Sequence, residues 1–234
     1  MQSTKVTEKK LNTDPENKYL ARMPRSRYSF EMIRDHVLAS SGILNKEIGG
    51  RSVKTYQPEG MWKATSSGRG LLSTYTQDHN EDLYRRGIYI FFKRTSLPPV
   101  PMFFDANTRD QCEVSRSNTM TPLQALIMLN DPTVLEAARV FSENLNSADS
   151  SAEQKIETAF RSILCRTIKP EEKDLLISYY KQQEAHFTEN PQKAKAFIQV
   201  GEYPTAQGRN SIKVAALMQV IHTMYNMEET IIKT

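Results

Sequence analysis

HNEDLYRRGIYIFFKRT (residues 79–95), FFDANTRDQCEV (103–114) and NTMTPLQALIMLNDP (118–132) follow one another in the middle of the chain. Together they hold its densest mixture of aromatic, Arg and carboxylate residues. The first stretch allows two interpretations. Its centre, IYIFF (88–92), has the composition of a buried strand, because aromatic and β-branched residues favour strands. The residues on either side of it decide between strand and helix.

Those flanking residues favour a helix. Asp78 and Glu81 have the spacing of an N-terminal capping arrangement, and the apolar residues that follow fall on one helical face. Pro98-Pro99 then stops any continuation. We therefore predict a helix over residues 79–94. RGIYIFF also resembles an RNA-binding strand motif, but a helix would destroy the alternation of aromatic residues that such a strand needs. We accordingly expect no nucleic-acid binding.

The third stretch carries two helix starts in succession. Thr121 and Gln124 have the spacing of a capping box, with proline at the first helical position. They open a short apolar helix over residues 123–129. Asp131 then caps a second helix that begins with Pro132. Two helices joined by so short a link must turn sharply against each other.

Helices are also predicted on both sides of this centre. Ser29 caps a helix over residues 30–45, which we expect to end at Gly49-Gly50. After the polar linker at 146–154, apolar residues recur at helical spacing. They predict helices over residues 153–165, 170–187, 191–199 and 210–231.

The remaining segments are predicted to be irregular. They are a polar arm lying over the domain (1–28), a Gly-rich loop (49–78), a proline-rich crossover (95–120) and an exposed loop (201–210). The predicted fold class is mainly α, an irregular helical domain with long loops and a C-terminal helical subdomain. We expect residues 1–150 to form the core unit with its arm, and residues 151–234 to form the subdomain packed on it.

Composition limits the classes of function. Hydrophobic residues make up 38% of the 234, the mean hydropathy is −0.57 and the net charge is +4. No apolar run approaches the roughly 18 residues of a membrane span. Basic and acidic residues are interspersed, whereas nucleic-acid binders usually segregate them. The first 18 residues have no apolar signal-peptide core, and the abrupt, uncapped start suggests a fragment of something longer.

Metal and thiol chemistry find little support. The four histidines are scattered, and two cysteines alone cannot form a metal site. We therefore predict no metal site and no catalytic residues. Acidic neighbours would suppress a Cys112 thiolate. Whether Cys112 and Cys165 form a disulfide cannot be judged from sequence.

A cationic surface is the main candidate for ligand binding. Arg85, Arg86 and Arg94 could recognise a carboxylate, sulfate or phosphate, because guanidinium groups bind such anions bidentately. The competing interpretation is internal pairing with nearby acids, namely Glu81, Asp82, Asp105 and Asp110. The candidate ligand-binding residues are Trp62, Arg85, Arg86, Arg94, Arg109 and Arg116. The candidate structural residues are Asp78, Glu81, Asp105, Thr121, Gln124 and Asp131.

A resemblance to a known family rests first on three motifs, LYRRGIYIFFKRT, FFDANTRDQC and NTMTPLQALIMLNDP. With DPENKYLARMPR (14–25), EMIRDHVLASSGILNKEIGG (31–50) and KTYQPEGMW (54–62), they resemble the C-terminal domain of unknown function that accompanies planctomycete-type cytochrome c domains. This is the PSD-one domain, domain of unknown function fifteen-fifty-three. Family members usually have a further N-terminal region rich in Trp and Arg, so the resemblance implies a chain truncated at that end.

The resemblance implies an exported protein, periplasmic or at the cell surface, and supplies no catalytic residues. Heme c would belong to an accompanying domain, with no cofactor in this chain. The predicted function is a non-catalytic helical scaffold or interaction module of a larger exported, cytochrome-c-associated protein. Its partners would be other domains of the parent protein or a cytochrome c domain. The alternative is a domain that binds or processes an anionic glycan, using an Arg-rich cleft beside the Trp62 loop.

Overall fold

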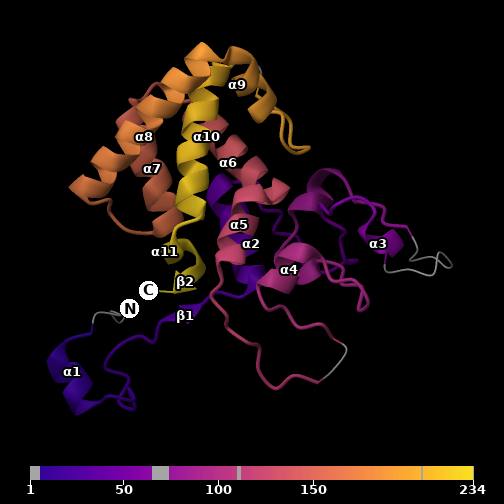
Figure 1. The fold of residues 1–234 in the computed structure, drawn as a ribbon, viewed down its shortest axis with the longest axis vertical. Coiled ribbons are helices and arrows are strands. Elements are labelled where there is room, and N and C mark those ends of the chain that lie inside the picture. The colour runs from indigo at the N-terminus through magenta and orange to yellow at the C-terminus, as the bar shows by residue number, and fades with distance from the viewer. Residues whose placement is uncertain (1–5, 65–73, 110–111, 207, 234) are drawn as a thin grey trace.

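The fold is known from a computed structural model, which describes residues 6–64, 74–109, 112–206 and 208–233. It is mainly α, as predicted (Figure 1). The long helices are α2 (Phe30–Ser41), α6 (Pro132–Leu145), α7 (Ala152–Leu164), α8 (Pro170–Glu189) and α10 (Ser211–Tyr225). The shorter helices are α1 (Glu8–Thr13), α3 (Met61–Ala64), α4 (Pro99–Phe103), α5 (Pro122–Asn130), α9 (Pro191–Phe197) and α11 (Glu228–Ile231).

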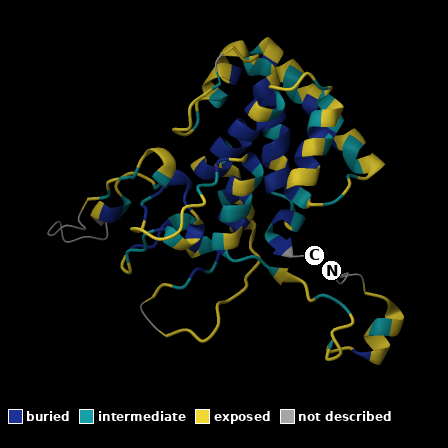
Figure 2. Cartoon of the chain, turned by 180° about the vertical axis from the view of Figure 1, so that it is seen from behind, coloured by how far each residue is buried: buried dark blue, intermediate teal, exposed yellow. Residues whose placement is uncertain are grey.

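Helix α10 is the centre of the core. Between Val214 and Tyr225 it is apolar and buried except on the side that carries Gln219 and Thr223, as expected for a helix largely surrounded by others. It packs against α6, α7, α8 and α9, and α6 in turn packs against α2. Figure 1 shows α10 between α7 and α8 on one side and α6 on the other, and Figure 2 shows that the buried residues gather on these helices.

One hydrophobic cluster joins the two predicted subdomains. It contains Phe30 and Val37 of α2 together with Phe160 of α7 and Leu217 of α10. The boundary near residue 150 stays a prediction. The polar segment there is a short connection, in which Ser151 and Gln154 form a capping box for α7.

A small antiparallel sheet joins a segment near the N-terminal end of the described chain to its C-terminal end. Strand β1 (Ser26–Arg27) pairs with β2 (Ile232–Lys233), and Ser26 lies opposite Lys233. The segment before β1 contains α1, whereas the sequence predicts an extended arm lying over the domain. Figure 1 shows that it projects away from the helices.

The predicted helix over residues 79–94 is wrong. Two short 3₁₀ turns, Asn80–Tyr84 and Gly87–Tyr89, are separated and followed by extended backbone. The tertiary environment satisfies the backbone groups that a helix would have paired internally. The Arg34 guanidinium of α2 donates to the carbonyl oxygen of Leu83 at 2.5 Å, and Asp35 accepts from the Gly87 N–H at 2.6 Å.

Close packing requires the glycine at position 87. A Cβ there would lie 2.7 Å from the Cα of Glu31, so a side chain would push the turn off α2. Val53 bonds to this segment as well, donating to Tyr89 O and accepting from Phe91 N, both at 2.8 Å. Because residues 79–94 are not helical, a helix does not exclude an RNA-binding strand there. The segment nevertheless forms only isolated bridges and not a strand.

Two helix ends also differ from the prediction. Helix α2 stops at Gly42, whose φ of 85° is left-handed, and the amides of Ile43 and Leu44 both donate to Leu38 O. The predicted stop at Gly49-Gly50 is therefore wrong. The predicted helix over 210–231 is divided at Asn226 into α10 and α11.

Candidate functional site

Arg85 is a structural clamp in this fold. It is buried, and its guanidinium donates to the carbonyl oxygens of Arg51, at 2.8 Å, and of Gly49. The same group lies 4.1 Å from the centroid of the Tyr89 ring. Arg85 therefore holds the Gly-rich segment after α2 against residues 85–89.

The other candidate arginines are spread over several surfaces. Arg86 donates to Asp35 at 2.8 Å, and Arg116 forms a bidentate pair with Glu31 at 2.8 and 3.0 Å. Arg109 lies 4.8 Å from the centroid of Phe92. Arg94 is exposed. Neither acidic partner, Asp35 or Glu31, is among those expected from the sequence.

Trp62 lies inside an aromatic cluster. Its side chain is 2% exposed, with Tyr75 at 5.0 Å and Phe91 at 5.9 Å between ring centroids. The ammonium groups of Lys93 and Lys54 lie 4.7 and 5.8 Å from the centre of its ring. Trp62 thus anchors its loop to the 89–93 segment.

Of the candidate structural residues, Thr121 and Gln124 make the expected contacts, whereas Asp105 and Asp78 have other partners. Asp105 accepts from Arg27 at 2.6 Å and from the Thr119 amide at 2.9 Å, and these bonds hold its pKa below the usual range although burial opposes them. Thr121 and Gln124 form the predicted capping box of α5. Asp78 caps no helix; it pairs with Arg51 at 2.9 Å. Glu81 is exposed.

The exposed cysteines do not pair. Cys112 and Cys165 are both free thiols, so the disulfide that the count allowed does not form. Cys165 adopts a left-handed conformation, with φ of 53°, at the C-terminus of α7. Within the described ranges, no three His, Cys, Asp or Glu side chains are arranged to hold a metal ion.

Helix α6 carries a buried ionic network that was not predicted from the sequence. Glu136, Arg139 and Glu143 are all buried, and Arg139 donates to Glu143 at 2.9 Å. Glu136 accepts from the hydroxyls of Tyr84, at 2.9 Å, and Tyr56, at 3.0 Å. The sequence already contained a pattern that indicates such a network, because these three charged residues lie at helical spacing among the apolar residues of one helix.

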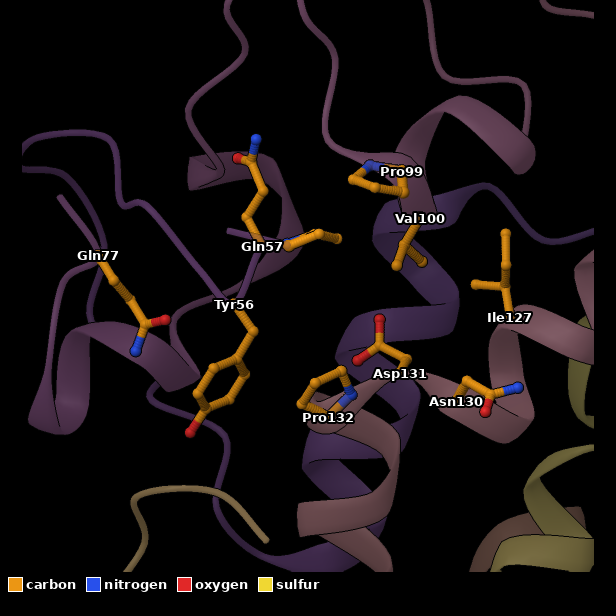
Figure 3. A pocket seen from close by; sticks show the side chains of 10 residues that line it. Tyr56, Gln57, Gln77, Pro99, Val100, Ile127, Asn130, Asp131 and Pro132 are labelled. Carbon is orange, nitrogen blue, oxygen red and sulfur yellow. The ribbon is translucent and has the colours of Figure 1, made fainter. Parts of the chain in front are cut away.

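A pocket of about 400 Å³ lies where α4 meets the junction of α5 and α6 (Figure 3). Its walls are mostly apolar, and its polar groups come from a few side chains, as in many binding pockets. The lining residues are Tyr56, Gln57, Pro58, Gln77, Pro99, Val100, Ile127, Asn130, Asp131 and Pro132.

Asp131 is the one acidic side chain among these described lining residues. In Figure 3 its carboxylate points into the space between Tyr56 and Val100. One carboxylate oxygen accepts from the Thr133 amide at 2.6 Å, which caps α6 as predicted. Burial raises the pKa of Asp131, and the nearby Arg34 guanidinium only partly opposes that shift. The amide nitrogen and oxygen of Gln57 are buried without a hydrogen-bond partner among the described residues.

Helix α5 borders this pocket and exposes leucines on its outer side. Leu123, Leu126 and Leu129 are 48%, 54% and 42% exposed. With about 100° between successive helical residues, Leu123 lies about 40° around the helix from Ile127, which lines the pocket, whereas Leu126 and Leu129 lie about 100° and 160° from it. We call Leu123, Leu126 and Leu129 the α5 leucine face. The sequence showed the apolar helix without showing which of its sides would stay uncovered.

Comparison with protein-family models identifies the family of the chain. A family model described as "Protein of unknown function (DUF1553)", PSD1, matches residues 1–180. The chain belongs to the PSD1 family. This confirms the resemblance. No curated protein and no solved structure matches it.

The PSD1 match includes the motif region, the pocket and the α5 leucine face, but stops before α9 and α10. The central core helix of this PSD1 protein therefore lies outside the matched residues. None of the helices in the described part of the chain is long and apolar enough to cross a membrane.

Proposed function

We propose that this chain is a non-catalytic interaction module, which docks a neighbouring domain of the same parent protein along the α5 leucine face. The single observation that carries the proposal is the exposure of Leu123, Leu126 and Leu129 on one uncharged helix. Contiguous exposed apolar surface beside polar residues is typical of interaction sites.

The pocket beside α5 supplies the second half of the docking surface. A partner helix lying on the leucine face would place one apolar side chain between Val100 and Ile127. A buried apolar anchor near the centre of an interface is typical of a hot spot.

The free energy expected from burying the three leucines is sufficient to hold two domains of one protein together. Fully burying an exposed leucine contributes about 1.5–3 kcal/mol. The three leucines are roughly half exposed, so their burial contributes about 2–4 kcal/mol in total. That is weak for free partners and sufficient for domains that a linker holds at high effective concentration.

The nature of the partner follows from the family resemblance and is part of the proposal. The parent would be an exported protein, periplasmic or at the cell surface. The partner would be another domain of it or a cytochrome c domain, and heme c would be carried there and not in this chain.

The anionic-glycan alternative has no specific observation in its favour. It requires cationic groups and an aromatic ring open to one cleft. In this fold, Arg85 binds backbone carbonyls, Arg86 pairs with Asp35, and Trp62 is buried.

Site-specific photocrosslinking in the native host tests the proposal. A benzoylphenylalanine residue replaces Leu126, and the matched control replaces Leu175, a leucine of α8 that is 70% exposed. We expect position 126 to give one dominant adduct, with a heme-staining polypeptide or another segment of the parent chain, and position 175 to give none. Leu126→Asp, combined with a crosslinker at position 123, should abolish the adduct. Equal adducts at positions 126 and 175, or none at either, would refute the proposal.

A further inference from the structure

A second, larger cleft lies on another part of the molecule. Its volume is about 800 Å³, and three segments line it: the chain after α2 (42–46), the turn at Asn80 and Glu81, and the loop Glu202–Pro204. Tyr84 closes the base of the cleft. We call it the Glu202 cleft. Its volume is within the range of sites that bind small organic ligands.

Glu202 is held in a fixed position. One of its carboxylate oxygens lies 2.9 Å from Nδ1 of His79, and the other accepts from the side-chain amide of Gln77 at 2.7 Å. Its backbone N–H donates to the Tyr56 hydroxyl at 2.9 Å. A carboxylate oriented by several contacts loses little further conformational freedom when it binds a ligand.

The buried ionic network of α6 fixes the backbone of the same loop. The Tyr203 N–H donates to Glu136 at 2.6 Å, and Arg139 donates to the Tyr203 carbonyl at 2.5 Å. Arg139 also donates to Val200 O at 3.1 Å, and the Ala206 N–H donates to Glu143 at 3.2 Å. Three buried charges thus hold one exposed, irregular loop.

A contribution to stability alone does not account for this network. Desolvating buried ion pairs often offsets their mutual attraction, so such pairs are weak contributors to stability. A rigid loop that presents side chains to a cleft is, however, what a binding site requires. The network holds the backbone of the loop that carries Glu202 and Tyr203.

The side chains of the cleft select the class of ligand. Tyr203 is 36% exposed and packs edge-on against Tyr84, with ring centroids 5.5 Å apart. Asn80, Glu81, Glu202 and Lys46 also line the cleft. Donors and acceptors around an aromatic ring suit a molecule with many hydroxyl groups and an apolar C–H face.

We propose that the Glu202 cleft binds a neutral saccharide, with one sugar ring against Tyr203 and a pair of hydroxyls donating to Glu202. The cleft carries charges of both signs, from Lys46, Glu81 and Glu202, which suits a neutral ligand, and Glu202 already lies within hydrogen-bond distance of His79 and Gln77. The cleft shares no lining residue with the α5 leucine face, although Tyr56 and Gln77, which line the pocket beside α5, also contact Glu202. The inference concerns a ligand and does not depend on domain docking.

Isothermal titration calorimetry of the folded chain tests the inference with cellotetraose and chitotetraose as probes, and with spermidine as the cationic comparison. We expect one of the two sugars to bind at millimolar or lower concentration. Tyr203→Ala, which keeps the backbone bonds to Glu136 and Arg139, should weaken that binding at least tenfold. Glu202→Gln should weaken it by a similar factor.

The matched control is Glu171→Gln, an exposed carboxylate on α8 outside the cleft, which should bind the sugar as the wild type does. Circular dichroism verifies that each variant is folded. Leu126→Asp should likewise leave sugar binding unchanged, so failure of the docking proposal and failure of this one are distinguishable. Three results would overturn the inference: no binding of either sugar, unchanged sugar binding in both cleft variants, or spermidine binding at the cleft in place of sugar.

Discussion

Gly201→Ala offers the sharpest test of how α6 holds the loop above it. Gly201 has a φ of +81°, and a Cβ there would lie 2.1 Å from both Cδ and Oε1 of Glu136. Glu136 is buried and cannot move toward solvent without giving up its bonds to Tyr84, Tyr56 or the Tyr203 amide. The substitution therefore combines backbone strain with displacement of a buried carboxylate.

The magnitude follows from those two contributions. A left-handed conformation costs an alanine about 1–2 kcal/mol relative to glycine. Losing one hydrogen bond to a buried charged group costs about 1.5–3 kcal/mol. The expected loss of stability is thus about 2.5–5 kcal/mol, which is a large fraction of the 5–15 kcal/mol typical of a folded domain.

Gly208→Ala is the matched control. Its φ of +77° imposes the same backbone strain, but nothing lies within 4 Å of the Cβ that would be added. It should therefore lose only the first contribution, about 1–2 kcal/mol. The difference between the two variants isolates the clash with Glu136.

Urea denaturation measures both variants, followed by the fluorescence of Trp62, the only tryptophan and a buried one. In a Glu136→Ala background the clash is gone, so Gly201→Ala should then cost no more than Gly208→Ala. Equal losses for the two glycine variants in the wild-type background would refute the reasoning.

Three further predictions concern charged and titrating groups. Arg85→Met should lower the free energy of unfolding in urea by about 2–4 kcal/mol, because it removes two hydrogen bonds from a buried guanidinium to the carbonyl oxygens of Arg51 and Gly49. Arg86→Met, at an exposed pair, should change stability little, and equal effects of the two variants would contradict the clamp. Burial lowers the pKa of His222, so the unfolded state binds its proton more readily and stability should fall as the pH drops below about 6.5. His222→Gln should reduce that slope, by at most about 1.4 kcal/mol per pH unit, and an unchanged slope would exclude the histidine as its source. Pairing with Arg166 lowers the pKa of Glu172 to about 2, so its stabilisation is present above the ordinary pKa of 4.5 and is lost as the pH falls toward 2. Glu172→Gln should therefore lower the melting temperature at pH 7 and leave it unchanged near pH 2; a uniform decrease would contradict this origin.

Local signals predicted the helices that begin with good caps. Thr121, Gln124 and Asp131 act within three residues of their own positions, so the sequence alone was sufficient to place the starts of α5 and α6. Helices α7 and α8 begin within a residue of the predicted positions for the same reason.

Long-range contacts explain the largest error. Residues 79–94 have helical patterning, but Arg34 and Asp35 of α2 bind their backbone directly, and Gly87 fits only without a side chain. None of these contacts can be seen in a window of neighbouring residues. The same limit applies to the predicted ligand-binding residues, because Arg86 and Arg116 pair with acids 51 and 85 positions away.

The two surfaces on which the proposals rest could be identified only from the structure. The α5 leucine face depends on which side of an apolar helix remains uncovered, and the Glu202 cleft joins residues more than a hundred positions apart. The ionic residues of α6 were visible in sequence, but their partners on the 200–206 loop were not.

The position of α10 at the centre of the core has a consequence for biosynthesis. Helices α2, α6, α7 and α8 all contribute to a core that α10 completes, yet α10 begins only at Ser211. At about 5–20 residues per second, a ribosome needs roughly 10–35 s to go from Phe30 at the start of α2 to Ser211 at the start of α10. During this interval the apolar faces of the earlier helices have no final partner. These faces stay uncovered until α10 emerges, and a shortened chain that ended with the family match at residue 180 would expose the same surfaces permanently.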